Sequence, residues 1–278
     1  MNIILCADDF GRSMNRNLAI DFAFKHNMIK SAGLIVSSKY TYEAVSLAST
    51  NGYLRDIHLH LCLDSNGEIS GGARPLSEKF RKDPHFCTNN MFSDVNYYRI
   101  DFYRYVSLFY DELEKQYLEF KKITKGKANL QHIDFHIYRN LSFPVGIAYR
   151  KLIKNYRIKS ARYIGLHQLD RPIGGGYHGM KKYFAHALIS RQLNGKKGEI
   201  VPSCTIGYFM KNRDKLKKCD CIELYCHPDL IDGKLVDNTK NSFDSNISFL
   251  ENNYNEVAAS IADNCFVSWR AYVDGLVT

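Results

Sequence analysis

Two adjacent carboxylates, Asp8 and Asp9, directly follow the first apolar run of the chain. Residues 3–7 are continuously apolar, which predicts a buried strand, and the Phe-Gly pair after the carboxylates predicts a turn. Two neighbouring negative charges repel each other and resist burial unless a cation, a proton or hydrogen-bond donors compensate them. The pair therefore indicates a metal site or an acid–base site at a strand end; the alternative is that Asp9 only caps the next helix.

Histidines occupy one face of two further predicted strands, residues 56–64 and residues 130–138. In both segments polar and apolar side chains alternate, so the polar ones share a face. That face carries His58 and His60 in the first segment and His132, Asp134, His136 and Tyr138 in the second. A third apolar run, residues 221–226, ends at His227, just before a proline that cannot continue a central strand.

These residue types suit metal-assisted hydrolysis. One aspartate and two histidines that leave positions open form a ligand set for Zn²⁺ or another first-row metal, and for Mg²⁺ if water completes the coordination. A second carboxylate beside the ion would act as general base toward water, and a histidine across the site would act as general acid for a leaving group.

Each histidine also has a structural alternative. His60 could be a buried histidine that is hydrogen-bonded to a neighbour, and His227 could have a structural role at a strand end. His132 could replace His136 as the ligand or could orient Asp134, and we prefer His136 because it lies closer to the strand end. His58 lies two residues deeper than His60, which favours a positioning or substrate contact over ligation.

Helical periodicity separates these strands. It predicts helices over residues 13–27, 42–51, 97–125, 144–155, 181–194 and 246–264, and further strands over residues 31–38, 161–166, 200–207 and 265–269. Strands that alternate with helices predict a parallel α/β fold, and a TIM-barrel-like (β/α) barrel suits one domain over residues 1–278. In such barrels catalytic residues lie at the C-terminal strand ends, where five of the residues named above fall: Asp8, Asp9, His60, His136 and His227.

Two glycine-containing segments are predicted as loops, residues 65–96 and residues 174–176. The first is long enough to form a substrate-binding lid after the strand of His58 and His60. Aromatic residues in this loop and in residues 205–210 could stack on sugar rings: Phe80, Phe86, Phe92, Tyr208 and Phe209.

Composition and charge restrict the classes of binding partner that we expect. The net charge is +9, but lysines and arginines are spread along the chain, so we expect no nucleic-acid partner. No apolar run approaches a membrane span, and the sequence starts directly with a strand, so we expect no membrane partner and a cytoplasmic location. The eight cysteines form no pair of CxxC motifs and lie mostly in apolar runs, which predicts reduced core thiols.

The chain resembles the YdjC-like carbohydrate deacetylases, a family that includes the chitooligosaccharide deacetylases. The resemblance rests on four motifs that occur in the family's order: Ala7-Asp-Asp-Phe-Gly11 with Ser13 and Asn17, Leu59-His60-Leu61, His132-Ile-Asp-Phe-His136, and Glu223-Leu-Tyr-Cys-His227-Pro228. It implies a distorted (β/α) barrel that binds one divalent metal ion, Mg²⁺ or Zn²⁺, and removes an N-acetyl group from an amino sugar or oligosaccharide. It also implies roles for five residues: Asp9, His60 and His136 as metal ligands, Asp8 as the base, and His227 as the group that assists the leaving amine.

Four further residues are expected to position these groups or to contact substrate: His58, His132, Asp134 and Arg162. The sequence departs from the family pattern at His58, Phe135 and Tyr138, and the segment after Arg162 is only loosely similar. Two other functions therefore stay open. One is another metal-dependent hydrolase on the same barrel, acting on a phosphoester or a non-sugar amide; the other is a catalytically silent carbohydrate-binding homologue. A homodimer also stays open.

Overall fold

The computed structural model describes residues 1–63, 74–83, 102–136, 143–162, 201–216, 219–238, 248–249 and 265–276. Within this part of the chain an eight-stranded parallel sheet has the order β5-β4-β3-β2-β1-β7-β6, with β11 also paired to β1. The strands are β1 (Asn2–Phe10), β2 (Ser31–Leu34), β3 (Ile57–Leu61), β4 (Asn129–Phe135), β5 (Ser160–Ala161), β6 (Ser203–Thr205), β7 (Cys221–Cys226) and β11 (Cys265–Phe266).

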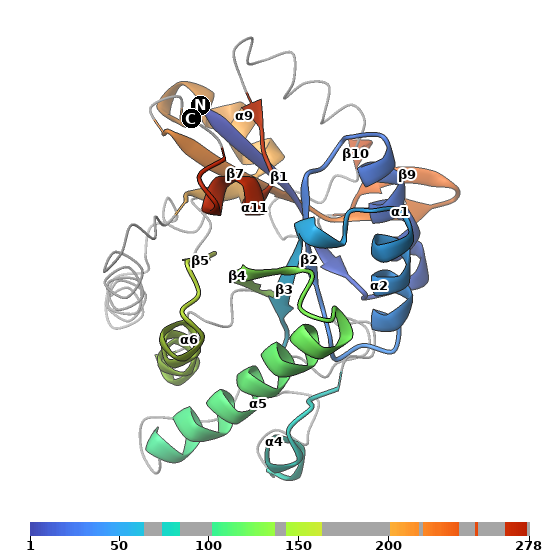
Figure 1. The fold of residues 1–278 in the computed structure, drawn as a ribbon. Coiled ribbons are helices and arrows are strands. Elements are labelled where there is room, and N and C mark those ends of the chain that lie inside the picture. The colour runs from blue at the N-terminus through green and yellow to red at the C-terminus, as the bar shows by residue number, and fades with distance from the viewer. Residues whose placement is uncertain are drawn as a thin grey trace.

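Helices surround this curled sheet (Figure 1). They are α1 (Met14–Lys25), α2 (Thr41–Thr50), the short 3-10 helix η1 (Leu54–Asp56), α4 (Glu78–Lys82), α5 (Phe102–Ile123), α6 (Phe143–Tyr156), α9 (Ile206–Leu216) and α11 (Trp269–Val273). The start of α1 has a local cause, because the Ser13 side chain accepts a hydrogen bond from the backbone N–H of Arg16. Ser13, and not Asp9, is therefore the N-cap, which contradicts the capping alternative for Asp9. Among the described helices, none is long and apolar enough to cross a membrane.

The parallel α/β fold predicted from the sequence is confirmed, and the described strands form a half-barrel. Strands β5 and β6 are the two edges of the described sheet, so closure into a TIM-like barrel is not shown. Residues 163–200, which join these edges in sequence, lie outside the described residues, as do the predicted loop at 174–176 and the predicted helix at 181–194.

The central strand β1 is buried on both faces, as parallel strands covered by helices are. Ile3, Leu5 and Ala7 enter the larger core, whereas Ile4 and Cys6 enter a smaller core that includes Trp269 and Val267. Because all strands of this sheet run the same way, the C-terminal ends of β1, β3, β4 and β7 meet at one edge. The candidate site residues predicted from the sequence lie at this edge.

Several elements differ from the sequence prediction. Helix α9 begins at Ile206, inside the predicted strand 200–207, of which only residues 203–205 form β6. Residues 248–249 form strand β10 (Ser248–Phe249) inside the predicted helix 246–264, whose remaining residues are outside the described part. Phe80 and Phe209 are fully buried core residues, so the expectation that they stack on sugars was wrong. Phe86, Phe92, Tyr138 and most of the predicted lid at 65–96 fall outside the described residues.

A hairpin after β7 was not predicted. Strands β8 (Pro228–Ile231) and β9 (Lys234–Asp237) pair antiparallel, and β10 adds to them in a separate three-stranded sheet. Pro228 ends β7, as expected, but it also begins β8. The turn residues Asp232 and Gly233 have φ values of 51° and 73°. An Asp-Gly pair is a strong hairpin signal, so the sequence did contain the information.

Six cysteines in the described part form no disulfide, and five of them are buried, as predicted: Cys6, Cys62, Cys204, Cys221 and Cys226, with Cys219 partly exposed. Cys87 and Cys265 lie where side chains are not described. The burial of five of these six cysteines agrees with the prediction that they are core residues.

Candidate metal centre

A backbone irregularity at the end of β1 directs both acidic side chains toward one site. In a regular strand, neighbouring residues such as Asp8 and Asp9 would face opposite sides of the sheet. The β1–β2 register shifts between Ala7 and Phe10, and Asp9 has a φ of 67°, a left-handed conformation that is uncommon for a residue other than glycine. Such backbone strain is often found at functional sites, and here it turns the two carboxylates toward the same site.

Asp9, His60 and His136 meet at this edge, and all three are buried. Asp9 Oδ1 lies 2.8 Å from His136 Nδ1 and 3.3 Å from His60 Nε2. One ligand atom from each residue can be chosen so that the three lie within 4.8 Å of one another. The Nε2 atoms of His60 and His136 have no hydrogen-bond partner among the described residues. Buried imidazole nitrogens need a partner, so this donor set fits a divalent cation.

Neighbouring charges favour the ionised forms of both Asp9 and His60. Burial alone would raise the pKa of Asp9, but His136, His60 and Arg16 outweigh it and hold this pKa well below its usual value. Burial alone would lower the pKa of His60, but Asp134, Asp9 and Asp8 outweigh it and raise this pKa to about 10. The site thus stabilises a positive charge at the position where the three candidate ligand atoms converge.

Asp134 orients His60 from behind. Its Oδ1 lies 2.6 Å from His60 Nδ1, which leaves Nε2 directed at Asp9. A carboxylate behind a histidine in this way commonly fixes the ring of a metal ligand. Asp134 Oδ2 lies 3.1 Å from the Nε2 of the buried His58, so His58 contacts the carboxylate behind His60. Gly33 provides the necessary space, because a Cβ there would lie 3.1 Å from His60 Nδ1.

Arg162 connects the acidic groups around the site. Its guanidinium contacts Asp8 Oδ2 at 2.5 Å and Asp134 Oδ2 at 3.2 Å, and it forms two hydrogen bonds of 2.7 Å to Glu223. Trp269 Nε1 donates to the same Glu223 carboxylate at 2.7 Å. Burial opposes the charge of Arg162, but the surrounding carboxylates outweigh it and raise its pKa well above the usual value. The arginine thus holds Asp8 in place while leaving Asp8 Oδ1 without a hydrogen-bond partner in the described part of the chain.

His227 directly follows β7 and lies beside Asp8. Its Nε2 is 3.9 Å from Asp8 Oδ2, and its side chain is 21% exposed. Burial lowers the pKa of His227, although Asp9 and Asp8 oppose this shift. A partly exposed histidine next to a carboxylate is placed to exchange a proton with a group arriving from solvent.

His132 is placed away from the trio. Its Nδ1 lies 2.7 Å from Ser160 Oγ, and its ring stacks on Trp269 with ring centroids 3.7 Å apart. Burial and His58 lower its pKa well below the usual value. Of His132 in β4 and His136 directly after it, only His136 contacts Asp9, so the geometry favours His136 as the ligand, whereas His132 packs against Trp269.

Two arginines near Asp9 were missed by the sequence analysis. Arg12 contacts Asp9 Oδ2 at 3.1 Å, and Arg16 lies 3.8 Å from the same oxygen. Asp9 therefore presents Oδ1 to the histidines and Oδ2 to the arginines. The only sequence signal was their spacing of three and seven residues after Asp9, which ordinary surface helices also show.

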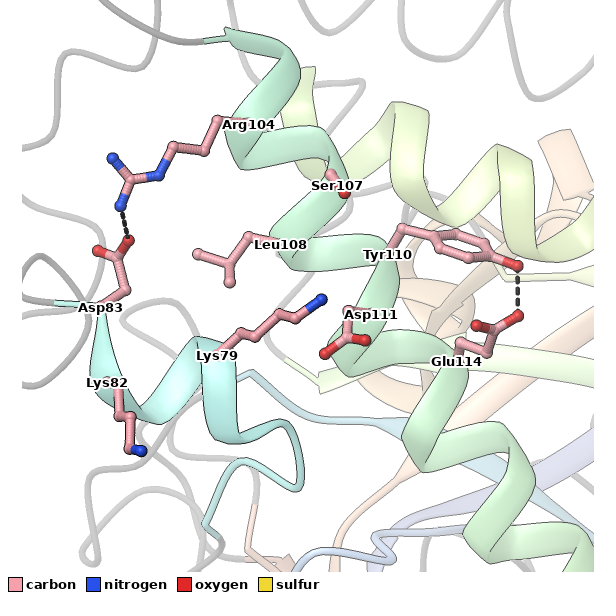
Figure 2. Close-up of a pocket in the computed structure, with 9 residues that line it drawn as sticks. All are labelled: Lys79, Lys82, Asp83, Arg104, Ser107, Leu108, Tyr110, Asp111 and Glu114. Atoms are coloured by element: carbon pink, nitrogen blue, oxygen red, sulfur yellow. Dashed lines mark hydrogen bonds and ion pairs between the residues drawn. The ribbon is translucent and has the colours of Figure 1, made fainter.

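A separate cavity lies between α4 and α5 (Figure 2). It has a volume of about 610 Å³ and is lined by Lys79, Lys82, Asp83, Arg104, Ser107, Leu108, Tyr110, Asp111 and Glu114. Its lining contains no histidine and no residue of the Asp9 cluster. Several of its polar groups are already paired, since Arg104 contacts Asp83 at 2.9 Å and Tyr110 donates to Glu114 at 2.5 Å. We therefore place the chemistry at the Asp9 cluster and not in this cavity.

An acidic and histidine-rich cluster at the C-terminal edge of a parallel α/β half-barrel is a place where a divalent metal ion could be held. The chain belongs to the YdjC-like protein family, whose model matches residues 2–263. A carbohydrate deacetylase from Clostridium beijerinckii is 24% identical over 248 residues, which cover 87% of this chain and 87% of the relative.

A solved structure from Enterococcus faecalis, of a protein named for a proposed role in cellobiose-phosphate cleavage, superposes with a TM-score of 0.56. It is 19% identical and covers 83% of this chain and 82% of that chain. At this identity the likeness supports the fold alone, and it agrees with the curled, mostly parallel sheet described above.

Proposed function

We propose that the protein is a metal-dependent carbohydrate deacetylase that hydrolyses the N-acetyl group of an amino sugar or oligosaccharide. The observation that carries the proposal is the buried Asp9–His60–His136 trio beside Asp8, whose Oδ1 is unpartnered in the described residues. The low-identity relative named a carbohydrate deacetylase supports the substrate class. With this function we also propose a distorted (β/α) barrel formed as one domain by residues 1–278.

Asp9, His60 and His136 would hold the ion. When bound, a divalent ion supplies Lewis acidity toward the acetyl carbonyl and lowers the pKa of a coordinated water. Two imidazoles and one carboxylate favour Zn²⁺ or another first-row ion over Mg²⁺.

The remaining steps belong to the protein's own side chains. Asp8, fixed through Oδ2 by Arg162, accepts the proton of the attacking water at Oδ1. The C–N bond breaks, acetate forms, and His227 passes a proton to the departing amine. The proton that Asp8 accepts from water balances the one that His227 gives to the amine, and the two residues are neighbours, with His227 Nε2 3.9 Å from Asp8 Oδ2.

Acetate release tests this function. Purified protein loaded with Zn²⁺ is expected to release acetate from N-acetylglucosamine oligomers. It should release no phosphate from a sugar phosphoester and should not deacetylate a small non-sugar amide. Phosphate release without acetate release would support the other metal-hydrolase class. Sugar binding without any product would support the silent binding homologue.

A further inference from the structure

Arg16 is a buried cation whose hydrogen-bonding capacity is only partly used. Its side chain is 2% exposed, yet it lies at the base of α1 next to the candidate metal ligand Asp9. Its NH2 group contacts Asp229 Oδ2 at 3.1 Å, and its NH1 group lies 3.8 Å from Asp9 Oδ2. Neither Nε nor NH1 has a hydrogen-bond partner in the described ranges. Burying a guanidinium with unpaired N–H groups is costly, so stability alone does not explain this residue.

Asp229 belongs to the β8–β9 hairpin, which lies beside α1 (Figure 1). Asn15 of α1 also reaches the hairpin, because its Nδ2 lies 3.4 Å from the carbonyl oxygen of Leu230. In the described part of the chain, Arg16 is the charged residue of α1 that contacts both this hairpin and the end of β1.

The same hairpin holds the backbone of His227. The His227 N–H donates to Asp237 Oδ1 at 2.8 Å, and the Asn238 N–H donates to the His227 carbonyl at 2.9 Å. The Asn238 side chain then donates to Asp229 Oδ2 at 3.0 Å, the oxygen that Arg16 contacts. A continuous set of polar contacts therefore leads from Asp9 through Arg16 and Asp229 to His227.

We propose that Arg16 is a positioning residue that, through Asp229 and Asn238, fixes where His227 lies relative to Asp9. The catalytic consequence rests on the proposed deacetylase function, whereas the placement of His227 does not. Because Asp237 and Asn238 hold the backbone N–H and carbonyl of His227, loosening the Arg16–Asp229 contact is expected to move the proton donor without substituting a metal ligand. A displacement of about 1 Å at a reacting group can lower a rate by about 10²-fold.

The test compares two aspartate-to-asparagine variants that each weaken an ion pair of α1. Asp229→Asn weakens the contact with Arg16. Asp21→Asn is the matched control, because Asp21 pairs with Lys25 at 2.7 Å on the same helix and also accepts hydrogen bonds from Asn51 and Tyr53. A milder variant, Asn238→Ala, removes only the side-chain hydrogen bond to Asp229 and serves if Asp229→Asn does not fold.

Two readouts follow. The first is the imidazole resonance of His227 in ¹³C-labelled protein, assigned by its loss in His227→Asn; we expect it to shift in Asp229→Asn and Asn238→Ala but not in Asp21→Asn. The second is acetate release, where kcat is expected to fall about tenfold in Asp229→Asn. Its KM and Zn²⁺ affinity should stay within about twofold, because Asp229 touches neither substrate nor ligand.

An unchanged His227 resonance in Asp229→Asn and Asn238→Ala would overturn the proposal. An equal loss of kcat in Asp21→Asn would also overturn it, because the effect would then follow stability. If the wild-type protein releases no acetate, the proposed function fails, and the His227 resonance still decides the positioning role.

Discussion

Asp8→Asn is expected to lower kcat for acetate release by about 10²–10⁴-fold, the range attributed to a positioned general base. The substitution keeps the size of the side chain and leaves an oxygen that can still accept from Arg162. It removes the carboxylate that takes the proton from water. Zn²⁺ should remain bound, because the proposed ligands are Asp9, His60 and His136.

Steady-state kinetics and the zinc content of the same preparation measure this prediction. Asp21→Asn is again the matched control, since it removes a buried carboxylate whose partners Lys25, Asn51 and Tyr53 are not site residues, and it should keep its kcat. Retention of wild-type kcat by Asp8→Asn would exclude Asp8 as the base. Loss of Zn²⁺ in this variant would instead make Asp8 a ligand.

Arg162→Met is expected to destabilise the protein by about 3–5 kcal/mol, the range seen when one partner of a buried ion pair is removed. The reason is that Asp8, Asp134 and Glu223 then share a buried site without their common cation. Urea denaturation measures the loss. Arg270→Met is the control: its contact with Asp274 at 3.7 Å is exposed, and its loss should cost less than about 1 kcal/mol.

A double variant separates charge from packing. Adding Glu223→Gln to Arg162→Met removes one of the stranded carboxylates, so the two substitutions together should cost less than the sum of their separate effects. Strict additivity would show that Arg162 contributes through packing and not through its ion pairs.

Residue periodicity was enough to predict the parallel α/β fold and the edge at which the site lies. The alternation in residues 56–64 and 130–138 placed His60 and His136 on one face because the strand period is two, and in the structure both histidines lie against Asp9. Asp8 and Asp9 were found through a different signal, the unusual presence of two charges at the end of an apolar run.

The contacts that organise the site were harder to predict from the sequence. Arg162 was predicted as a site residue, but its partners were not. Asp8, Asp134 and Glu223 come from three different strands, and local sequence does not reveal which side chains pair across a sheet. The left-handed conformation of Asp9 also has no local signal, since glycine is the residue that usually marks such a position. The burial of Arg16 could not be foreseen, because it depends on a hairpin more than two hundred residues later.

The most direct test of the central claim, a metal centre formed by Asp9, His60 and His136, is the metal content of the purified protein by elemental analysis. The account predicts about one divalent ion per chain. His60→Ala and His136→Ala should lose it, whereas the matched variant His132→Ala, which also truncates a buried histidine, should retain it. Absence of bound metal after supplementation, or loss of metal in His132→Ala with retention in His136→Ala, would contradict the account.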